Sequence, residues 1–316
     1  MPSNHDVDHD RLAEAIEDII SETRDMTERG EAKLEGADLD AFGIAVLTKD
    51  GEMHTDGDAD ALFPIQSISK VFSLTLALER HSNDVWKRVG REPSGDPYNS
   101  ITDLERHEGI PRNPLINAGA LVVVDMLLNG VSGKKPPEFV RRRLEDVLGT
   151  KLSLDDEIVR SEEKGYINRA LANLAKSFDN LEHEVDAVMS EYVRQCAIRL
   201  SCRQLAQAGR YLMLEQLGDD LTAREVRRAR RLNAVMLTCG HYDGSGDFAF
   251  RVGLPSKSGV AGAILAVAPN TASIAVWSPG LDENGNSLVG THALEMLSEK
   301  MGWSIFGASG VSLEDE

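Results

Sequence analysis

Strand-like segments occur near both ends of this chain, and a long stretch of different character separates them. Residues 42–48 (FGIAVLT) predict a strand, and residues 49–52 (KDGE) predict a tight turn into a return strand that starts at Met53. Strand patterns return much later, in residues 248–252, 259–268 and 272–277. Hairpins at both ends favour one antiparallel sheet that combines N-terminal and C-terminal strands.

The middle of the chain has the periodicity of helices joined by loops. Helices are predicted over residues 10–25, 69–78, 118–128, 137–148, 154–163, 168–177, 184–199, 201–217, 222–237 and 288–301. This order predicts an α+β fold in which residues 1–84 and 238–316 form a discontinuous sheet domain with flanking helices. An all-helical domain, residues 85–237, is then inserted between the two parts. We expect a cleft, and therefore the functional site, at the junction of the two domains.

Composition restricts the class of protein and its surroundings. The hydrophobic fraction of 41% is that of a globular protein, and no apolar run approaches the ~20 residues that span a bilayer. The polar, acidic N-terminus lacks the features of a secretory signal. Three cysteines, an odd number in 316 residues, indicate reduced thiols. We therefore expect a cytoplasmic protein that does not associate with membranes.

The charge balance argues against nucleic acid as a partner. The chain has 34 Lys and Arg residues against 52 Asp and Glu residues, so its formal net charge is −18. A protein that binds the phosphate backbone of DNA or RNA needs an excess of positive charge on its binding face. A small-molecule substrate therefore fits this sequence better.

The segment FPIQSISKVFSLTLAL, residues 63–78, contains a candidate nucleophile. Ser67 and Lys70 are three residues apart at the start of a predicted buried helix, so their side chains share one face. The helix dipole favours a developing alkoxide on the serine, and desolvation favours the neutral lysine that a general base requires. The same S-x-x-K pattern also occurs at ordinary helix caps followed by a surface lysine. Further motifs are therefore needed.

A second motif, Lys257-Ser258-Gly259, stands beside an apolar strand near the C-terminus. On an edge strand opposite a serine nucleophile, it would supply a cation and a hydroxyl group, and the glycine would let a substrate approach the backbone. The backbone N–H groups of Val260 and Ser67 could then form an oxyanion hole. Tyr192 could relay a proton to a leaving amine, although the local sequence by itself favours an ordinary core tyrosine.

S-x-x-K followed by K-S-G is the motif order of serine β-lactamases and penicillin-binding proteins. Beyond these motifs, the sequence resembles a family with the same fold, the bacterial-type glutaminases, which hydrolyse L-glutamine to L-glutamate and ammonia. The resemblance lies in seven segments: IQSISKVF (65–72), EPSGDPYNS (92–100), PRNPLINAGA (111–120), EYVRQCAI (191–198), LTCGHYD (237–243), VGLPSKSGV (252–260) and GNSLVG (285–290). They span nearly the whole chain and occur in the order of the family.

The resemblance implies roles for individual residues. Ser67 resembles the nucleophile, Lys70 its general base and Tyr192 the tyrosine that assists proton transfer, while Val260 matches the oxyanion-hole position. The implied substrate-binding residues are Ser67, Tyr192 and Val260 themselves, with Gln66, Asn117, Glu162, Asn168, Tyr242 and Lys257. Asn117 and Asn168 would bind the substrate carboxylate, and Glu162 would pair with its ammonium group. Glu163 competes for that role, because the spacing from Glu162 to Asn168 is one residue shorter than usual in the family.

The remaining points concern cofactors, assembly and alternative functions. The family needs no metal or organic cofactor and assembles as dimers or tetramers, so we expect a homodimer or homotetramer. A penicillin-recognising hydrolase of the same fold is disfavoured because Val193-Arg194 follows Tyr192, where such enzymes have an S-D-N or Y-x-N motif. A catalytically impaired glutamine-binding protein stays open, since the tyrosine that precedes the first strand in the family has no counterpart here. A zinc site formed by Cys196, Cys202, Cys239 and His241 is disfavoured by its spacing.

Overall fold

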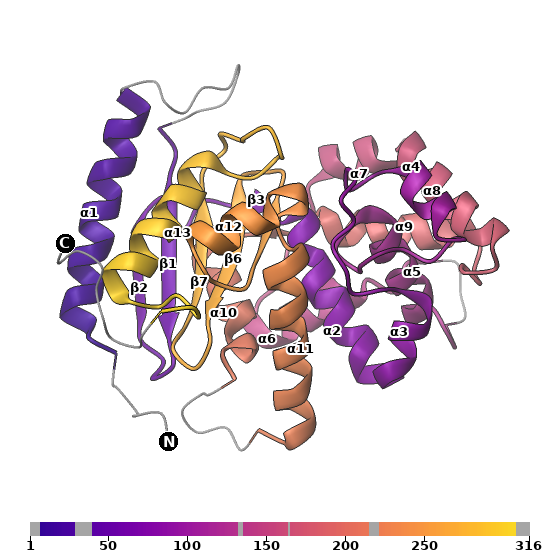
Figure 1. The fold of residues 1–316 in the computed structure, drawn as a ribbon, viewed down its shortest axis with the longest axis horizontal. Coiled ribbons are helices and arrows are strands. Elements are labelled where there is room, and N and C mark those ends of the chain that lie inside the picture. Colours follow the sequence, from indigo (N-terminus) through magenta and orange to yellow (C-terminus); the bar gives the residue numbers. More distant parts are fainter. Residues whose placement is uncertain (1–6, 29–39, 132–134, 164, 215–220, 308–316) are drawn as a thin grey trace. The chain divides into compact units, whose positions relative to one another are not determined.

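The structure, a computed structural model, describes residues 7–28, 40–131, 135–163, 165–214 and 221–307 (Figure 1). The chain forms two compact units. The first, which we call the sheet unit, comprises Met1–Leu62, Ser201–Asn233 and Asp247–Glu316. The second, the helical unit, comprises Phe63–Leu200 and Ala234–Gly246. Residues 63–84 thus group with the helices and residues 201–233 with the sheet, whereas the sequence-based boundaries lie at 84/85 and 237/238.

The sheet unit contains a five-stranded antiparallel sheet with strand order β2-β1-β7-β6-β5 (Figure 1). Its elements are α1 (His9–Glu28), β1 (Gly43–Thr48), β2 (Met53–Gly57), α10 (Cys202–Gly209), η3 (Arg210–Met213), β5 (Ser256–Gly259), β6 (Ala263–Ala268), β7 (Ala272–Trp277) and α13 (Leu288–Met301). Helices α11 (Ala223–Cys239) and α12 (Ser245–Arg251) each begin in one unit and end in the other. The predicted combination of N-terminal and C-terminal strands in one sheet is confirmed.

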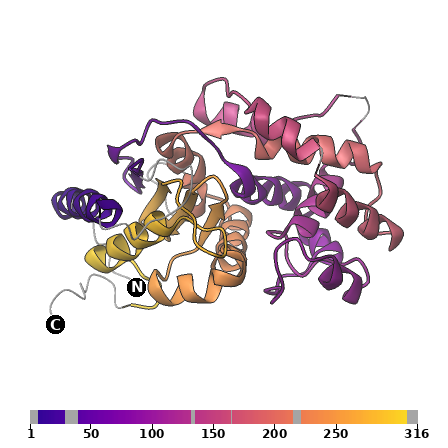
Figure 2. The ribbon, with the colours of Figure 1, turned by 90° about the horizontal axis from the view of Figure 1, so that it is seen from above.

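Both faces of this sheet are covered, which explains why its central strands are apolar throughout. Ile44, Val276 and Ile264 are paired across β1, β7 and β6 and belong to a core with Leu12 of α1 and Ala293 of α13. Figure 1 shows α13 in front of the strands, and Figure 2 shows α1 beside it. Side chains alternate along a strand, so the neighbouring row faces α10 on the opposite side.

Two of the predicted strands are wrong: one segment is helical, and the other is divided by a turn. Residues 248–252 lie in or directly after helix α12, where Phe248 and Val252 are buried and Phe250 is 91% exposed. Buried residues four apart share one face of a helix, and the exposed phenylalanine between them imitated the alternation of a strand. Residues 259–268 form the end of β5, a turn and β6 rather than one strand. Gly262 makes that turn at φ +90°.

The helical unit is built around α5 (Asn117–Leu127), whose residues are all buried. Helix α5 packs against α2 (Ser69–His81), α8 (Tyr166–Ser177) and α9 (Val185–Cys196). The remaining elements are β3 (Phe63–Pro64), η1 (Gln66–Ile68), η2 (Ser82–Asp84), α3 (Val85–Arg88), α4 (Ile101–Arg106), α6 (Phe139–Leu148), α7 (Asp156–Glu163), β4 (Arg199–Leu200) and η4 (Tyr242–Gly244). The predicted helix over 184–199 is wrong at its end, because residues 199–200 form β4.

A short antiparallel pair between β3 and β4 fixes the segment that leads to the candidate nucleophile. Phe63 pairs with Leu200, and the backbone N–H of Ile65 donates to the carbonyl of Ile198 at 2.8 Å. Ile198 follows α9 by two residues, so these bonds tie the entry to η1 and α2 to the end of α9.

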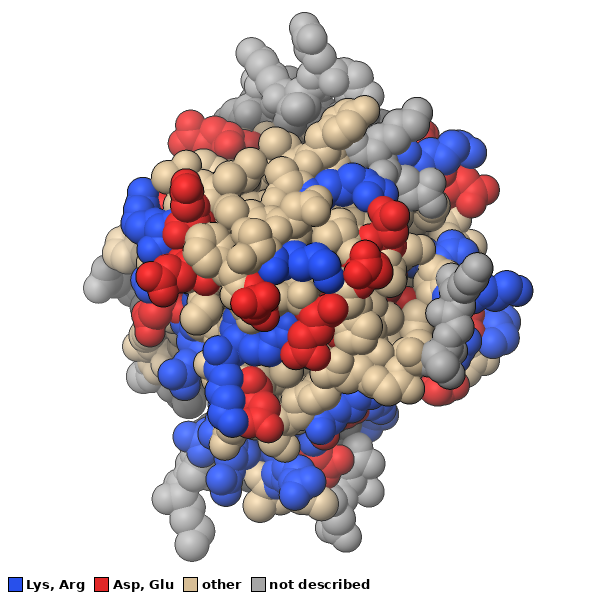
Figure 3. Space-filling view, turned by 90° about the vertical axis from the view of Figure 1, so that its right-hand side faces the viewer, with Lys and Arg blue, Asp and Glu red and all other residues tan. Residues whose placement is uncertain are grey.

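Charged side chains of both signs are interspersed on the face shown in Figure 3. Ion pairs in the helical unit join such charges, as between Arg169 and Asp186 at 2.6 Å and between Arg106 and Asp96 at 3.1 Å. Over the described ranges, no helix is both long enough and apolar enough to cross a membrane.

Candidate active site

Ser67 lies in a tight 3-10 turn, η1, directly before α2, and its side chain is buried. The residue before it, Gln66, has φ +46°, which lies in the left-handed region that residues other than glycine seldom occupy. The hydroxyl of Ser69 donates to the Gln66 carbonyl at 2.7 Å and holds this turn. Backbone strain of this kind persists where the surroundings enforce it, and it is concentrated at functional sites.

Lys70 lies in the first turn of α2, three residues after Ser67, and is fully buried. Its Nζ donates to the Asn117 side-chain oxygen at 2.6 Å and to the carbonyl of Leu115 at 3.2 Å. Both acceptors come from the start of α5, so the packing of α2 against α5 determines where the amine lies. Both of these acceptors are neutral oxygens, and the buried amine has lost its shell of water. These two features disfavour the charged form of the amine.

Asn117 connects the lysine to two further predicted site residues. Its Oδ1 also lies 3.4 Å from the Tyr192 hydroxyl, and its Nδ2 donates to Oδ1 of Asn168 at 2.8 Å. The four side chains come from α2, α5, α8 and α9, and all are buried. The helix packing therefore brings an amine, two amides and a phenol together at one place.

Tyr242 joins the same group through Ser67. It lies in η4 with φ +55°, and its phenol interacts with the Ser67 side chain. Burial raises the pKa of the Tyr242 hydroxyl above its ordinary value, although the hydrogen bond with Ser67 opposes this shift. The phenol is therefore neutral at physiological pH and can act as a hydrogen-bond donor beside the candidate nucleophile.

The structure also places residues at this site to which the sequence assigned no role. The Tyr98 ring packs on Tyr242 with 4.6 Å between ring centroids, and its carbonyl accepts from the Asn117 backbone N–H at 3.0 Å. Cys196 lies 3.8 Å from Ser69, measured between Sγ and Oγ. Tyr98 belongs to EPSGDPYNS, one of the segments that carry the family resemblance, and this was the available signal.

Lys257 and Val260 belong to the sheet unit. Lys257 is fully buried in β5, an edge strand as predicted, and its Nζ donates to the carbonyl of Ser258 at 2.7 Å. Val260 follows β5 and is 39% exposed. Their action together with Ser67 stays a prediction. Glu162 and Glu163 lie in α7, but their side chains are outside the described part of the structure.

This cluster of serine, lysine, asparagine and tyrosine side chains suits acyl transfer better than metal binding. The cluster contains a candidate nucleophile, a candidate base and hydrogen-bond donors. Among the predicted site residues of the helical unit with described side chains, there is no carboxylate or imidazole that could bind a metal ion. The three cysteines are buried thiols, and none of them is in a disulfide. Within the described ranges, they do not join His241 in a group close enough to hold an ion.

Comparison with known proteins gives one family. The glutaminase family model matches residues 31–306. A glutaminase of Azorhizobium caulinodans is 52% identical over 307 residues, which cover 94% of this chain and 99% of that protein. A glutaminase of Methylobacterium radiotolerans is 50% identical over 308 residues, with the same two shares of 94% and 99%.

Solved structures agree with the sequence comparison. The crystal structure of a probable glutaminase of Bacillus subtilis aligns with a TM-score of 0.78 and 34% identity, covering 94% of this chain and 97% of that chain. A Bacillus subtilis glutaminase in covalent complex with 5-oxo-L-norleucine, formed by reaction with 6-diazo-5-oxo-L-norleucine, aligns with a TM-score of 0.76 and 32% identity, covering 92% and 98%. The predicted β-lactamase-like α+β architecture is therefore confirmed. The chain belongs to the glutaminase family.

Proposed function

We propose that this protein hydrolyses the side-chain amide of L-glutamine to L-glutamate and ammonia, with Ser67 as nucleophile. The observation that carries the proposal is the buried group of Ser67, Lys70, Asn117 and Tyr192 in a chain that belongs to the glutaminase family along nearly its whole length. A related Bacillus subtilis glutaminase forms a covalent complex on reaction with 6-diazo-5-oxo-L-norleucine. A covalent step on a nucleophile is consistent with that chemistry.

In the proposed mechanism, the neutral amine of Lys70 takes the proton of the Ser67 hydroxyl. Oγ then attacks the side-chain carbonyl carbon of glutamine, and the electron pair of the C=O bond moves to oxygen. The backbone N–H groups of Ser67 and Val260 stabilise this oxyanion, and each such donor is typically worth about 3 kcal/mol in the transition state. The C=O bond then re-forms as the C–N bond breaks. The departing nitrogen takes the proton that Lys70 removed from Ser67, relayed through Tyr192, and leaves as ammonia, so Lys70 is neutral again.

The second half of the reaction consumes water. Lys70 accepts a proton from a water molecule that attacks the γ-glutamyl ester, and Ser67 leaves with the proton that restores its hydroxyl. The products are glutamate and the original enzyme. The chemistry of this sequence of steps requires acid–base groups and hydrogen-bond donors, and no step requires a redox change.

Recognition of the substrate is proposed to use the polar groups around the serine. Asn117 and Asn168 would donate to the α-carboxylate, and Glu162 or Glu163 would pair with the α-ammonium group. Gln66, Tyr242 and Lys257 would line the pocket for the side-chain amide. We further propose a cytoplasmic enzyme that works as a homodimer or homotetramer.

The test is ammonia release by purified protein, measured with glutamine and with asparagine. We expect turnover of glutamine, and we expect Ser67→Ala to abolish it while the far-UV circular dichroism and melting temperature stay those of the wild type. Wild-type protein that releases no ammonia from glutamine would refute the proposal. Rapid hydrolysis of nitrocefin instead would favour a penicillin-recognising enzyme of the same fold.

A further inference from the structure

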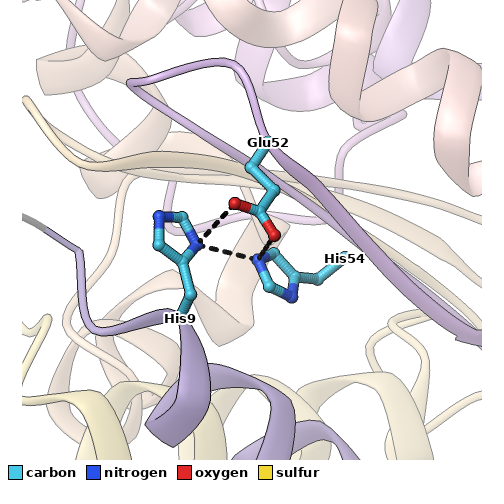
Figure 4. A group of neighbouring side chains, drawn as sticks. All are labelled: His9, Glu52 and His54. Atoms are coloured by element: carbon cyan, nitrogen blue, oxygen red, sulfur yellow. Dashed lines mark hydrogen bonds and ion pairs between the residues drawn. The ribbon is translucent and has the colours of Figure 1, made fainter.

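Two histidines and a glutamate of the sheet unit meet at one place, and none of them is among the proposed catalytic residues (Figure 4). His9 is the first residue of α1, His54 lies in β2, and Glu52 directly precedes β2. Their candidate ligand atoms all lie within 4.8 Å of one another. Glu52 and His54 are two residues apart, so along an extended chain their side chains point to the same side.

The distances match those between ligands of one metal ion. His9 Nδ1 lies 3.0 Å from His54 Nε2 and 3.4 Å from Glu52 Oε2, and His54 Nε2 lies 3.4 Å from Glu52 Oε1. An ion about 2.05 Å from both nitrogens, the usual Zn²⁺ distance, would make an N–Zn–N angle of about 94°. The two nitrogens face different oxygens of Glu52, so this carboxylate lies beside both of them and can supply the third ligand. Figure 4 shows the three groups turned toward one another.

A second carboxylate orients one of the candidate ligands. His9 Nε2 lies 2.8 Å from Oδ2 of Asp50, while the other oxygen of Asp50 accepts from the Thr48 hydroxyl. If Nε2 donates to Asp50, the lone pair of His9 Nδ1 is directed at His54 and Glu52. Carboxylate–histidine–metal arrangements of this kind fix the tautomer of a metal-binding histidine.

We propose that His9, Glu52 and His54 bind one divalent transition-metal ion, with zinc as the best-fitting candidate, and leave a fourth position open to solvent. Two imidazoles and a carboxylate favour Zn²⁺ over Mg²⁺ or Ca²⁺, which prefer all-oxygen sites. The Glu52 side chain is 57% exposed, so an ion can enter from solvent.

The ion would join the start of α1 to the hairpin formed by β1 and β2. Helix α1 already packs against β2 and α13. Since the site requires residues 9, 52 and 54 to be together, the ion binds the folded sheet unit more tightly than the unfolded chain. It therefore raises the melting temperature with increasing free ion concentration. This role is independent of amide hydrolysis.

The test is titration of metal-free, full-length protein with Zn²⁺ against a chromogenic chelator, followed by Co²⁺ titration with detection of its visible absorption. We expect one tight equivalent of Zn²⁺ and the intense Co²⁺ bands of a four-coordinate site. His9→Ala and His54→Ala should weaken binding at least 100-fold. Asp50→Asn should weaken it by roughly 10-fold to 100-fold, as is usual for a group that orients a ligand.

Two variants keep the outcome interpretable. Glu52→Gln removes an exposed carboxylate and leaves the core intact, so it should stay folded, weaken zinc binding and alter the Co²⁺ spectrum. His292→Ala is the matched control, because His292 also lies beside a glutamate of the sheet unit but belongs to no such group among the described residues. It should bind zinc like the wild type. The proposal is overturned if wild-type protein binds no stoichiometric zinc, or if the variants at His9, Glu52 and His54 bind it as tightly as the wild type.

Discussion

Replacing Asn117 by aspartate tests whether Lys70 is the base that activates Ser67. The substitution changes little in shape, but it puts a carboxylate where Oδ1 now accepts from the lysine Nζ at 2.6 Å. A carboxylate there stabilises the ammonium form of Lys70, which cannot accept the serine proton. We therefore expect a loss of turnover at neutral pH that more alkaline solution restores.

The size of the effect follows from the separation of the two charge centres, which is larger than the distance between Nζ and the nearer oxygen because the carboxylate charge is spread over two oxygens. Two unit charges centred about 4 Å apart attract each other by about 4 kcal/mol at the effective dielectric constant of about 20 that suits protein sites. Since about 1.4 kcal/mol corresponds to a factor of ten, kcat at pH 7 should fall roughly a thousandfold. The rise of kcat with pH should move by about three pH units toward alkaline pH.

The assay is ammonia release at saturating glutamine, measured from pH 6 to pH 11 together with KM. Asn117→Ala is the first control, because it removes the amide without adding a charge; it should lower kcat/KM and leave the position of the pH profile unchanged. Asn168→Asp is the second, since this carboxylate lies one amide farther from Nζ and should chiefly raise KM through repulsion of the substrate carboxylate. A wild-type pH profile for Asn117→Asp would refute Lys70 as the base.

Two further predictions concern the scaffold of the helical unit. Asp125 is buried and accepts from Arg88 at 2.6 Å and from the His183 backbone N–H at 2.8 Å; burial alone would raise its pKa, but these bonds together hold the pKa below its ordinary value. Asp125→Asn should therefore cost about 3 kcal/mol near pH 7, because it removes the buried charge partner of Arg88 and leaves only the more exposed Glu182 beside that cation. Chemical denaturation should show this cost shrinking as the pH falls through the folded-state pKa of Asp125, which lies below its ordinary value. A cost independent of pH would contradict the assignment. Gly119→Ala should lower the free energy of unfolding by at least about 2 kcal/mol and should also lower kcat. A Cβ at this position would lie 1.9 Å from the Asn113 carbonyl oxygen and would displace the start of α5. A wild-type melting temperature would contradict this prediction.

The parts of the site that could be predicted from local sequence patterns are those whose residues lie close together in the chain. Ser67 and Lys70 are three residues apart, at the end of η1 and the start of α2, and the apolar run after them indicated that the lysine would be buried. Asn117, Asn168 and Tyr192 were assigned through family resemblance, since nothing in their local patterns separates them from core residues. Their hydrogen bonds join positions 47 to 75 residues apart, and such pairings depend on helix packing.

Two kinds of feature could not be predicted. Residues 248–252 combine buried and exposed apolar side chains in an order that fits both periodicities over so short a segment, and burial on one helical face decided the outcome. The group of His9, Glu52 and His54 joins the start of the first helix to a hairpin more than 40 residues later. The hairpin part, with Asp50, Glu52 and His54 at alternate positions, was visible in the sequence, but its partner on α1 was not.

Backbone conformation gives a separate argument that the side chains beside Ser67 contribute to function. Gln66 and Tyr242 both have positive φ, at +46° and +55°, and glycine would adopt this backbone conformation at a lower cost in free energy. A side chain retained at such a position costs about 1 kcal/mol or more, so it has to offer something that glycine cannot. Gln66 is adjacent to Ser67 in sequence and Tyr242 interacts with its hydroxyl, which connects both strained positions to the proposed nucleophile. Six other described residues that are not glycine also have positive φ, so this conformation is not confined to the site. At Gln66 and Tyr242 it lies beside the proposed nucleophile, and these two side chains are expected to matter more for turnover than for stability.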